Sequence, residues 1–138
     1  MIALTDVYTG TNDFRDAADA KTKMSAWVEN KQQFFAHAAQ HDFEAWLLPY
    51  WSTIQQMAGH NKTVPTGVPE SVNHGNSPSK RVSEIFRLGK KRDYIKTRDA
   101  TKILSKKGND LSIAINACPE LKAFVNTIIT LSEGEPIP

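Results

Sequence analysis

Residues 37–48 read HAAQHDFEAWLL, and this stretch joins the end of one short apolar run to the start of another. The first run, residues 34–39, has the length of a buried strand. After Asp42 the apolar residues recur at helical spacing as far as a glycine at position 59, and Pro49 inside this segment predicts a kink. The stretch therefore indicates a strand that runs directly into a helix beginning at Asp42.

A second strand is indicated at the start of the sequence, where residues 1–8 read MIALTDVY and a cluster of turn-forming residues follows. Asp13 or Asp16 can cap the next segment, which we expect to be a helix over about 16–31 with Trp27 on its buried face. The order strand, helix, strand normally gives a right-handed crossover between two parallel strands. We therefore predict a parallel sheet unit of the α/β class.

The rest of the chain is predicted to be helical after a long loop. Residues 59–79 are rich in Gly, Pro, Asn and Ser, so we expect a loop that is more mobile than its flanks, and we expect the tail after residue 132 to fray. The helix-compatible segments are residues 79–89, 97–106, 110–117 and 119–132. The predicted organisation is a single globular unit: an α/β part over 1–58, a loop over 59–79 and a helical extension over 80–132.

Composition limits the class of protein. The chain has 138 residues with 40% hydrophobic and 23% charged residues, which is ordinary for one globular domain. No apolar stretch approaches the roughly 20 residues that span a bilayer, and residues 1–10 lack the features of a signal peptide, so we expect a cytoplasmic protein. The single cysteine, Cys118, precedes a proline and is expected to be a small buried residue near a helix boundary.

The formal net charge of +2 conceals a strongly basic middle segment. Residues 80–107 carry eleven Lys and Arg against three Asp and Glu, whereas residues 1–70 and 108–138 are each net acidic. Such a segment is either an ordinary solvated face or a surface for a polyanion such as DNA or RNA, and both interpretations stay open. If it contacts nucleic acid, the candidate phosphate-binding residues are Lys80, Arg81 and Lys96.

Acidic residues follow both predicted strands. Asp6 ends the first strand, and His41, Asp42 and Glu44 follow the second; because parallel strands end at the same edge of a sheet, Asp6 and Glu44 should lie close together. Two carboxylates can share Mg²⁺, a hard cation that prefers oxygen ligands. Alternatively, Asp42 and Glu44 are an ordinary helix cap and first-turn acid, which needs no metal.

The two histidines of the opening stretch do not have the geometry of a zinc pair. His37 falls in the predicted strand and His41 in the turn after it, so their four-residue spacing does not place them on one helix face. His41 could still donate a hydrogen bond to a phosphate or to Glu44.

Several segments resemble one known family. The runs ALTDVYTGTNDFRDAADAK, FFAHAAQHDFEAWLL, NSPSKRV, DYIK and ACPELKAFV are similar, in order and spacing over nearly the whole chain, to the TOPRIM-like nucleases typified by AriB, the effector of the PARIS phage-defence system. The family has an Asp-x-Tyr motif after a strand and an acidic-Phe-Glu-Ala motif. The matching residues here are Asp6 and Tyr8 for the first motif, and Asp42, Phe43, Glu44 and Ala45 for the second.

The resemblance implies a fold, an activity and a partner. The implied fold is a partial TOPRIM-like (Rossmann-like) parallel sheet with a helical C-terminal extension. The implied activity is Mg²⁺-dependent nuclease action in phage defence with an AAA-type ATPase, with Asp6, His41 and Glu44 as catalytic residues and Asp6, Asp42 and Glu44 as metal ligands. Family members also carry an N-terminal Glu-Gly-x-Thr-Glu-like motif whose first Glu is the general acid/base, and this sequence does not contain it.

The missing motif leads to three hypotheses. The chain is expected to be the C-terminal two-thirds of a family member, as a truncated product, a split subunit or a degenerate copy, and to be inactive alone. We favour a nuclease portion completed by a missing N-terminal segment or another chain. The alternatives are a non-catalytic module that binds nucleic acid or the ATPase, and a regulatory decoy that occupies the ATPase.

Overall fold

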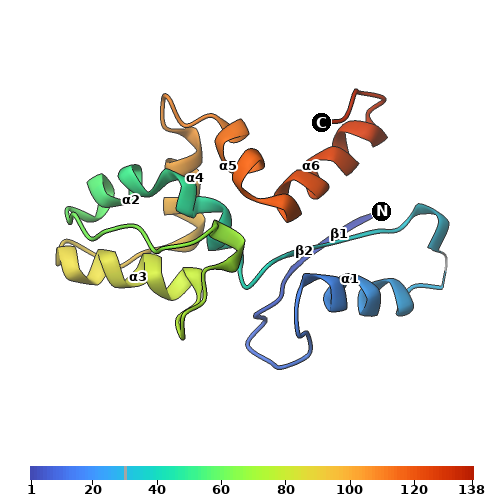
Figure 1. Cartoon of the computed structure of the whole chain (residues 1–138), viewed down its shortest axis with the longest axis horizontal. Helices are drawn as coiled ribbons and strands as arrows, with labels where there is room; N and C mark the ends of the chain where they lie inside the picture. Colours follow the sequence, from blue (N-terminus) through green and yellow to red (C-terminus); the bar gives the residue numbers. More distant parts are fainter. Residues whose placement is uncertain (30) are drawn as a thin grey trace.

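The computed structural model describes residues 1–29 and 31–138 and has a mixed α/β architecture (Figure 1). In the described part, the sheet has two parallel strands, β1 (Ile2–Asp6) and β2 (Phe35–Ala39). Asp6 is paired with Ala39, so the two strands end at the same level. The chain passes between them through α1 (Ala17–Ala26) and the short 3-10 turn η1 (Lys31–Gln33). The predicted strand, helix, strand order and the parallel pairing are confirmed.

Helix α1 is shorter than predicted. Asp16, and not Asp13, caps it by accepting a hydrogen bond from the amide of Asp19 at 2.8 Å. The core between α1 and the sheet consists of Val7, Ala17, Ala20 and Ala38, so the helix approaches the sheet only through the short side chains of its first turns. Trp27 is 68% exposed, and its predicted place on the buried face was wrong because α1 ends before it. Residue 30, within the predicted helix, lies outside the described residues.

Two segments replace the single kinked helix predicted after Asp42. They are the 3-10 helix η2 (Phe43–Tyr50) and the α-helix α2 (Trp51–Ala58). Pro49 has no N–H to donate and its ring clashes with a preceding α-helical turn, so the chain stays in the tighter 3-10 form until it has passed this residue. The chain thus changes helix type after Pro49, where one kinked helix was expected, and Gly59, with φ of 68°, ends α2 in the left-handed conformation as expected.

The four predicted C-terminal helices are confirmed to within one residue. They are α3 (Pro78–Gly89), α4 (Lys96–Ser105), α5 (Leu111–Ala117) and α6 (Pro119–Leu131). Gly89 ends α3, but the left-handed residue is Lys90, with φ of 54°. Glycine is needed at position 89 because a Cβ there would lie 1.7 Å from the carbonyl oxygen of Ala58. Gly89 thus allows α3 to approach the end of α2.

The main core lies among the helices and not at the sheet. Leu47 of η2, Ile54 of α2, Phe86 of α3 and Ile103 of α4 are fully buried in it, and α5 and α6 close it. The segment from residue 43 to 58, which the sequence grouped with the two strands, therefore shares its core with the later helices. Cys118 is buried between α5 and α6, as predicted, and burial raises the pKa of its thiol to about 12.

The loop and the tail are fastened to the helices. In the loop, the 3-10 turn η3 (Pro69–Ser71) carries the buried carboxylate of Glu70, which accepts hydrogen bonds from Trp46 Nε1 at 2.9 Å and from the amide of Glu120 at 3.0 Å. In the tail, the Asn126 side chain bonds both the N–H and the carbonyl of Ile137, at 2.8 and 3.0 Å. The tail was expected to fray, but this pair of hydrogen bonds docks it on α6.

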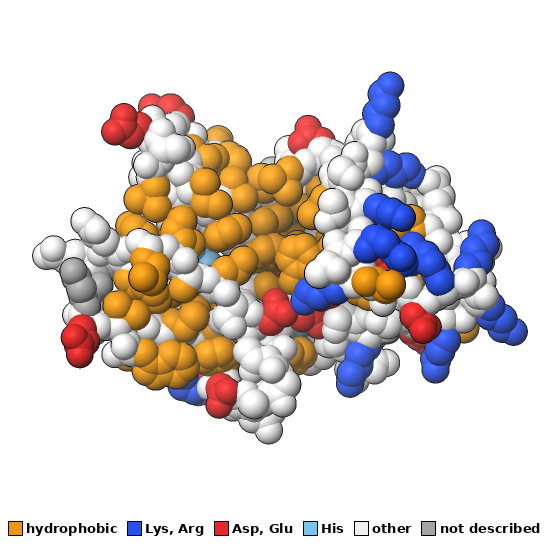
Figure 2. Space-filling model, turned by 180° about the vertical axis from the view of Figure 1, so that it is seen from behind, with side chains coloured by type: hydrophobic (Ala, Val, Ile, Leu, Met, Phe, Trp, Pro, Cys, Tyr) orange, Lys and Arg blue, Asp and Glu red, His pale blue; other side chains and the backbone are white. Residues whose placement is uncertain are grey.

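One face of the molecule divides into an apolar and a basic half (Figure 2). Figure 1 shows α1 and α6 on opposite sides of the two strands, and the remaining helices beside them. Seen from behind, apolar side chains gather over the sheet half, cations gather over the other helices, and acidic side chains lie between the two (Figure 2). Leu4 of β1 is 45% exposed, in keeping with a small sheet that lacks full cover. Across the described ranges, we find no helix whose length and apolar character would allow it to cross a membrane.

Candidate acidic site

The carboxylates of Asp6 and Glu44 meet at the end of the sheet. Lys96 at the start of α4 places its Nζ 3.2 Å from Asp6 Oδ2 and 3.4 Å from Glu44 Oε2. Because both oxygens lie close to the same nitrogen, they are less than the expected 8 Å or so from each other. The predicted proximity of the two acids is confirmed, although 38 positions separate them in the sequence.

The second oxygen of each carboxylate is fixed by the protein. Asp6 Oδ1 accepts a hydrogen bond from the amide of Phe43 at 2.9 Å, which holds the first turn of η2 against the end of β1. Glu44 Oε1 accepts one from the hydroxyl of Tyr94 at 3.0 Å. Glu44 Oε2 is buried without a hydrogen-bond partner in the described part of the chain. The two inner oxygens, Asp6 Oδ2 and Glu44 Oε2, are therefore left to face Lys96.

The pKa values of Glu44, Lys96 and Tyr94 are all raised, but for different reasons. Glu44 is 1% exposed, and its burial raises the pKa of the carboxyl, although the charge of Lys96 partly offsets this. For Lys96, burial lowers the pKa, but attraction to Glu44 and Asp6 outweighs it and the pKa is raised. Burial, with the charge of Glu44, also raises the pKa of Tyr94. Near neutral pH, Lys96 is therefore a cation and Tyr94 a neutral hydrogen-bond donor.

Asp42 plays a different part from the one predicted. Its carboxylate makes no cap bond to η2; instead both its oxygens lie 3.2 Å from the amide of Ser79 in the first turn of α3. Asp42 therefore caps a helix 37 positions further along the chain. Burial raises the pKa of this carboxyl, and the amide of Ser79 opposes the shift. Asp42 borders the same cleft as Asp6 and Glu44, so its predicted role as a metal ligand stays a prediction.

The histidines lie outside the acid pair. His41 occupies the turn after β2 with φ of 67°, its ring lies 5.2 Å from that of Tyr8, and its Nδ1 is buried with no hydrogen-bond partner among the described residues. Burial lowers the pKa of His41. His37 is in β2 and its Nε2 lies 2.9 Å from Thr127 Oγ1. The sequence correctly placed these two residues off a common helix. A catalytic role for His41 stays a prediction.

The structure separates the three predicted phosphate-binding residues. Lys80 borders the cleft that contains the acid pair and forms no ion pair among residues 1–29 and 31–138. Arg81 instead directs its guanidinium at the carbonyl oxygens of Asn73, His74 and Asn76, each at 3.4 Å, which fastens the loop. Lys96 is held by the two acids. Of the three, Lys80 alone is left open to a ligand in the described structure.

Part of the basic segment neutralises a buried acid. Asp99 of α4 is completely buried and accepts two hydrogen bonds from Arg92, at 2.7 and 2.9 Å, and one from Arg98 at 3.3 Å. Hydrogen bonds from these arginines and from the Ile95 amide lower the pKa of Asp99, although burial acts the other way. Arg92 and Arg98 therefore have a structural task that neither a solvated face nor a polyanion surface describes.

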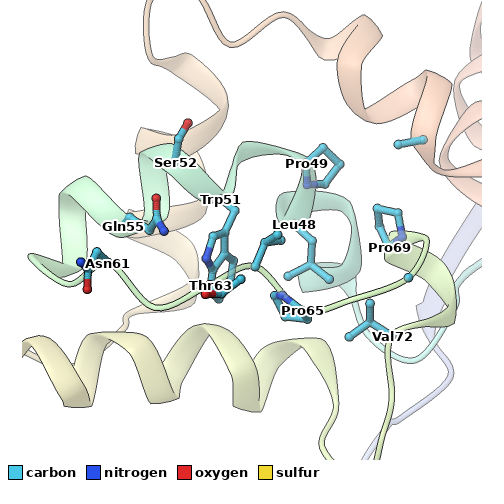
Figure 3. Close-up of a pocket in the computed structure, with 13 residues that line it drawn as sticks. Leu48, Pro49, Trp51, Ser52, Gln55, Asn61, Thr63, Pro65, Pro69 and Val72 are labelled. Atoms are coloured by element: carbon cyan, nitrogen blue, oxygen red, sulfur yellow. The ribbon is translucent and has the colours of Figure 1, made fainter.

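Two hollows of similar size have very different linings. One, of about 640 Å³, is lined by residues such as Leu48, Trp51, Pro65 and Val72, and no ionisable side chain borders it (Figure 3). The other, of about 600 Å³, contains the acid pair. We call it the acid cleft; its ionisable residues are Asp6, Asp42, Glu44, Lys80, Lys96 and Tyr8. Chemistry that needs charged groups is therefore expected in the acid cleft.

The donor set of the acid cleft can be tested against a divalent cation. The inner oxygens of Asp6 and Glu44 converge, and one of them is a buried oxygen without a hydrogen bond. Mg²⁺ is commonly held by one or two carboxylates while water or phosphate fills its other positions. In the described ranges, no three or more His, Cys, Asp or Glu side chains lie close enough together to hold a metal ion. The residues thus fit a hydrated cation held by two carboxylates, at the position that the Lys96 ammonium takes.

Sequence reasoning missed two features of this site. Tyr94 was not proposed as a partner of Glu44, and Lys96 was assigned to phosphate and not to the acid pair. Both residues lie in the short DYIK segment that leads into α4. A tyrosine and a lysine two positions apart carry no local signal of such a role. Only the tertiary structure shows that both side chains reach Glu44.

Comparison with known proteins places the chain in a family. No curated protein and no solved structure gives a significant match. Residues 1–129, which include both strands, the acid cleft and nearly all of α6, match one family along their whole length. The chain therefore belongs to the family described as Domain of unknown function (DUF4276).

Proposed function

We propose that this chain is a TOPRIM-like, Mg²⁺-dependent nuclease or the C-terminal portion of one. The observation that carries the proposal is the convergence of Asp6 Oδ2 and Glu44 Oε2 on one point in a cleft that Lys80 also borders. Carboxylate pairs that face a cleft next to a free cation suit a substrate that brings phosphate groups.

Each residue has a role that follows from its contacts. Asp6 and Glu44 would hold the cation, and the Phe43 amide and the Tyr94 hydroxyl fix the directions of their carboxylates. When bound, Mg²⁺ would supply positive charge to a phosphoryl oxygen and lower the pKa of a water ligand. Lys80, unpaired in the described structure, attracts a neighbouring phosphate. Tyr94 keeps its proton because its pKa is raised, and so it continues to orient Glu44.

The biological setting in this proposal comes from the sequence resemblance. An AAA-type ATPase as partner and a role in phage defence are typical of the family that the sequence resembles. The basic half of the surface is compatible with nucleic acid as the substrate (Figure 2).

A second function is favoured by one specific observation. Lys96 already occupies the position between the two acids, and no cluster of three metal-ligating side chains is found in the described ranges. Those features suit a non-catalytic module that retains the cleft and binds nucleic acid or the ATPase without cutting.

One set of assays separates the two functions. Labelled single-stranded and duplex DNA and RNA are incubated with the protein, with and without Mg²⁺, and both binding and cleavage are measured. The Asp6→Asn and Glu44→Gln variants remove one charge each and keep an acceptor oxygen for the Phe43 amide or the Tyr94 hydroxyl. Glu135→Gln, on an exposed side chain of the tail, is the matched control.

The outcomes assign the function. Cleavage that requires Mg²⁺, is lost in Asp6→Asn and Glu44→Gln and persists in Glu135→Gln supports the nuclease. Binding without cleavage supports the non-catalytic module. If the protein neither binds nor cleaves any of these substrates, a nuclease that acts by itself is ruled out, and the ATPase is the only partner left for the non-catalytic module.

A further inference from the structure

The ammonium of Lys96 is held at the acid cleft only by the acids themselves. Lys96 is the first residue of α4, where the helix dipole disfavours a positive charge. Its side chain is 49% exposed, so its flexible stem can turn into solvent. Among the described residues, its Nζ also lies 5.6 Å from the centroid of the Phe43 ring. The charge of the two carboxylates is therefore the main attraction that keeps the ammonium between them.

The carboxylates, in contrast, are held independently of Lys96. The Phe43 amide fixes Asp6, and the Tyr94 hydroxyl fixes Glu44, whose side chain is almost entirely buried. Departure of the ammonium would leave both inner oxygens where they are. Glu44 Oε2 would then be a buried oxygen with neither a hydrogen bond nor a counter-ion, which is costly unless another cation replaces the ammonium.

Lys96 and a metal ion cannot use these oxygens together. Mg²⁺ binds carboxylate oxygens at about 2.1 Å and keeps several waters around it. An ion bound to both inner oxygens would occupy the space between them and Nζ, which is only 3.2 and 3.4 Å away. The ion and the ammonium would repel each other at this separation, and no room would remain for the water shell.

We propose that Lys96 is an exchangeable counter-ion: it pairs with Asp6 and Glu44 in the free protein and must leave before a divalent cation can bind them. This inference rests on the proposed function, since it assumes that the acid pair is a cation site, and it adds how that site is regulated. Once displaced, Lys96 stays next to the cleft and becomes available to a phosphate. Metal binding and phosphate binding then support each other, because the same lysine links the two.

The test measures metal affinity directly. Mn²⁺ is titrated at pH 8 into the wild type and the variants, and free Mn²⁺ is followed by its EPR signal. Lys96→Met should bind Mn²⁺ about tenfold more tightly than the wild type, within the usual range of coupling between ligands. Lys96→Arg keeps the charge and should bind weakly. Lys102→Met, which removes an exposed cation from the same helix, should resemble the wild type.

A second measurement guards against a folding defect. Lys96→Met should unfold at a lower temperature than the wild type without metal, and added Mn²⁺ should raise its unfolding temperature by more than it raises that of the wild type. The double variant Lys96→Met, Glu44→Gln should lose this response, which ties the effect to the acid pair.

Each outcome has a distinct meaning. Equal affinity in the wild type and Lys96→Met, with binding lost in Glu44→Gln, would overturn the exchange but leave the cation site of the proposed function intact. An equal gain in Lys102→Met would also overturn it, because net charge alone would then explain the change. No Mn²⁺ binding by any variant would remove both the exchange and the metal site.

Discussion

Two clusters of acids and bases lie next to each other in this protein and differ in how well their acids are satisfied. In the first, which we call the Asp99 cluster, Asp99 accepts hydrogen bonds from Arg92, Arg98 and the Ile95 amide through both of its oxygens. In the second, the acid pair Asp6 and Glu44 shares the single ammonium of Lys96, and Glu44 Oε2 has no hydrogen bond in the described structure.

The difference separates a structural acid from a candidate functional one. The Asp99 carboxylate has one charge and two arginines around it, and its buried oxygens have no capacity left for a ligand. The acid pair carries two charges against one lysine, and its inner oxygens border a cleft. A buried polar group that lacks a partner costs free energy, so it persists where a ligand can use it. The sign and completeness of the charge balance, and not the number of charged residues, distinguish the two clusters.

Breaking the Asp99 cluster should have the largest effect on stability. Asp99→Ala removes the carboxylate that pairs with Arg92 and leaves this arginine without its counter-charge. We therefore expect the free energy of unfolding to fall by about 3 kcal/mol. Urea denaturation of both proteins measures the difference. Asp93→Ala is the matched control, because Asp93 is an exposed acid of the same segment, and it should be nearly neutral. Similar stabilities for the two variants would contradict the structural role of Asp99.

The cations at the acid cleft should contribute to nucleic-acid binding, and Arg81 should not. With Mg²⁺ present to displace Lys96 from the two acids, we expect the double variant Lys80→Met, Lys96→Met to flatten the slope of log K against log salt by roughly 1.4–1.8, about 0.7–0.9 for each lost phosphate contact. Arg81→Met should leave the slope unchanged, since its guanidinium bonds loop carbonyls. Fluorescence anisotropy with a labelled oligonucleotide at several salt concentrations gives the slopes. A solvated face that binds nothing predicts no change in either variant.

The two clusters should respond to pH in opposite directions. The folded pKa of Asp99 is lowered, so its contribution to stability is present above the unfolded value of about 3.8 and is lost as the pH falls through the folded pKa. The folded pKa of Glu44 is raised, so its contribution is fully present below about 4.5 and is lost as the pH rises through the folded pKa.

Isosteric variants make this contrast measurable. The cost of Asp99→Asn in the free energy of unfolding should grow with pH and then level off, whereas the cost of Glu44→Gln should be greatest in acid and shrink as the pH rises, each by on the order of 1 kcal/mol. Urea unfolding at several pH values between about 3 and 8 would show whether the cost of each substitution rises or falls with pH. Parallel curves for the two variants would show that the clusters do not differ in this way.

The smallest expected effect on stability concerns Asp42, which caps a helix and also borders the acid cleft. If its main task is to cap α3 through the Ser79 amide, Asp42→Ala should cost about 1 kcal/mol of stability. Ser77→Ala is the matched control, because Ser77 stands at the N-cap position of α3 but makes no side-chain cap bond. Thermal unfolding of the two variants compares them. A larger loss of stability in Ser77→Ala than in Asp42→Ala would show that Ser77, and not Asp42, caps α3.

The sequence predicted the elements of this fold better than their grouping. Short apolar runs and turn residues located both strands, and helical spacing located α3 to α6 to within one residue, because these signals depend on neighbours along the chain. The division between residues 58 and 59 followed a loop of Gly, Pro and Ser. The structure instead packs η2 and α2 with the later helices. Packing depends on which apolar faces meet, and a loop between two segments does not prevent their faces from meeting.

The sequence by itself also determined that Asp6 and Glu44 would meet, because parallel strands end at the same edge of a sheet and the residues after them inherit that position. Only the tertiary structure decided what surrounds them. Tyr94 and Lys96 come from a segment with no local signal for the acid pair, and Asp42 caps a helix that lies beyond the loop. Local patterns specify backbone conformation over a few residues, whereas the partner of a buried charge is chosen by the packing of distant helices.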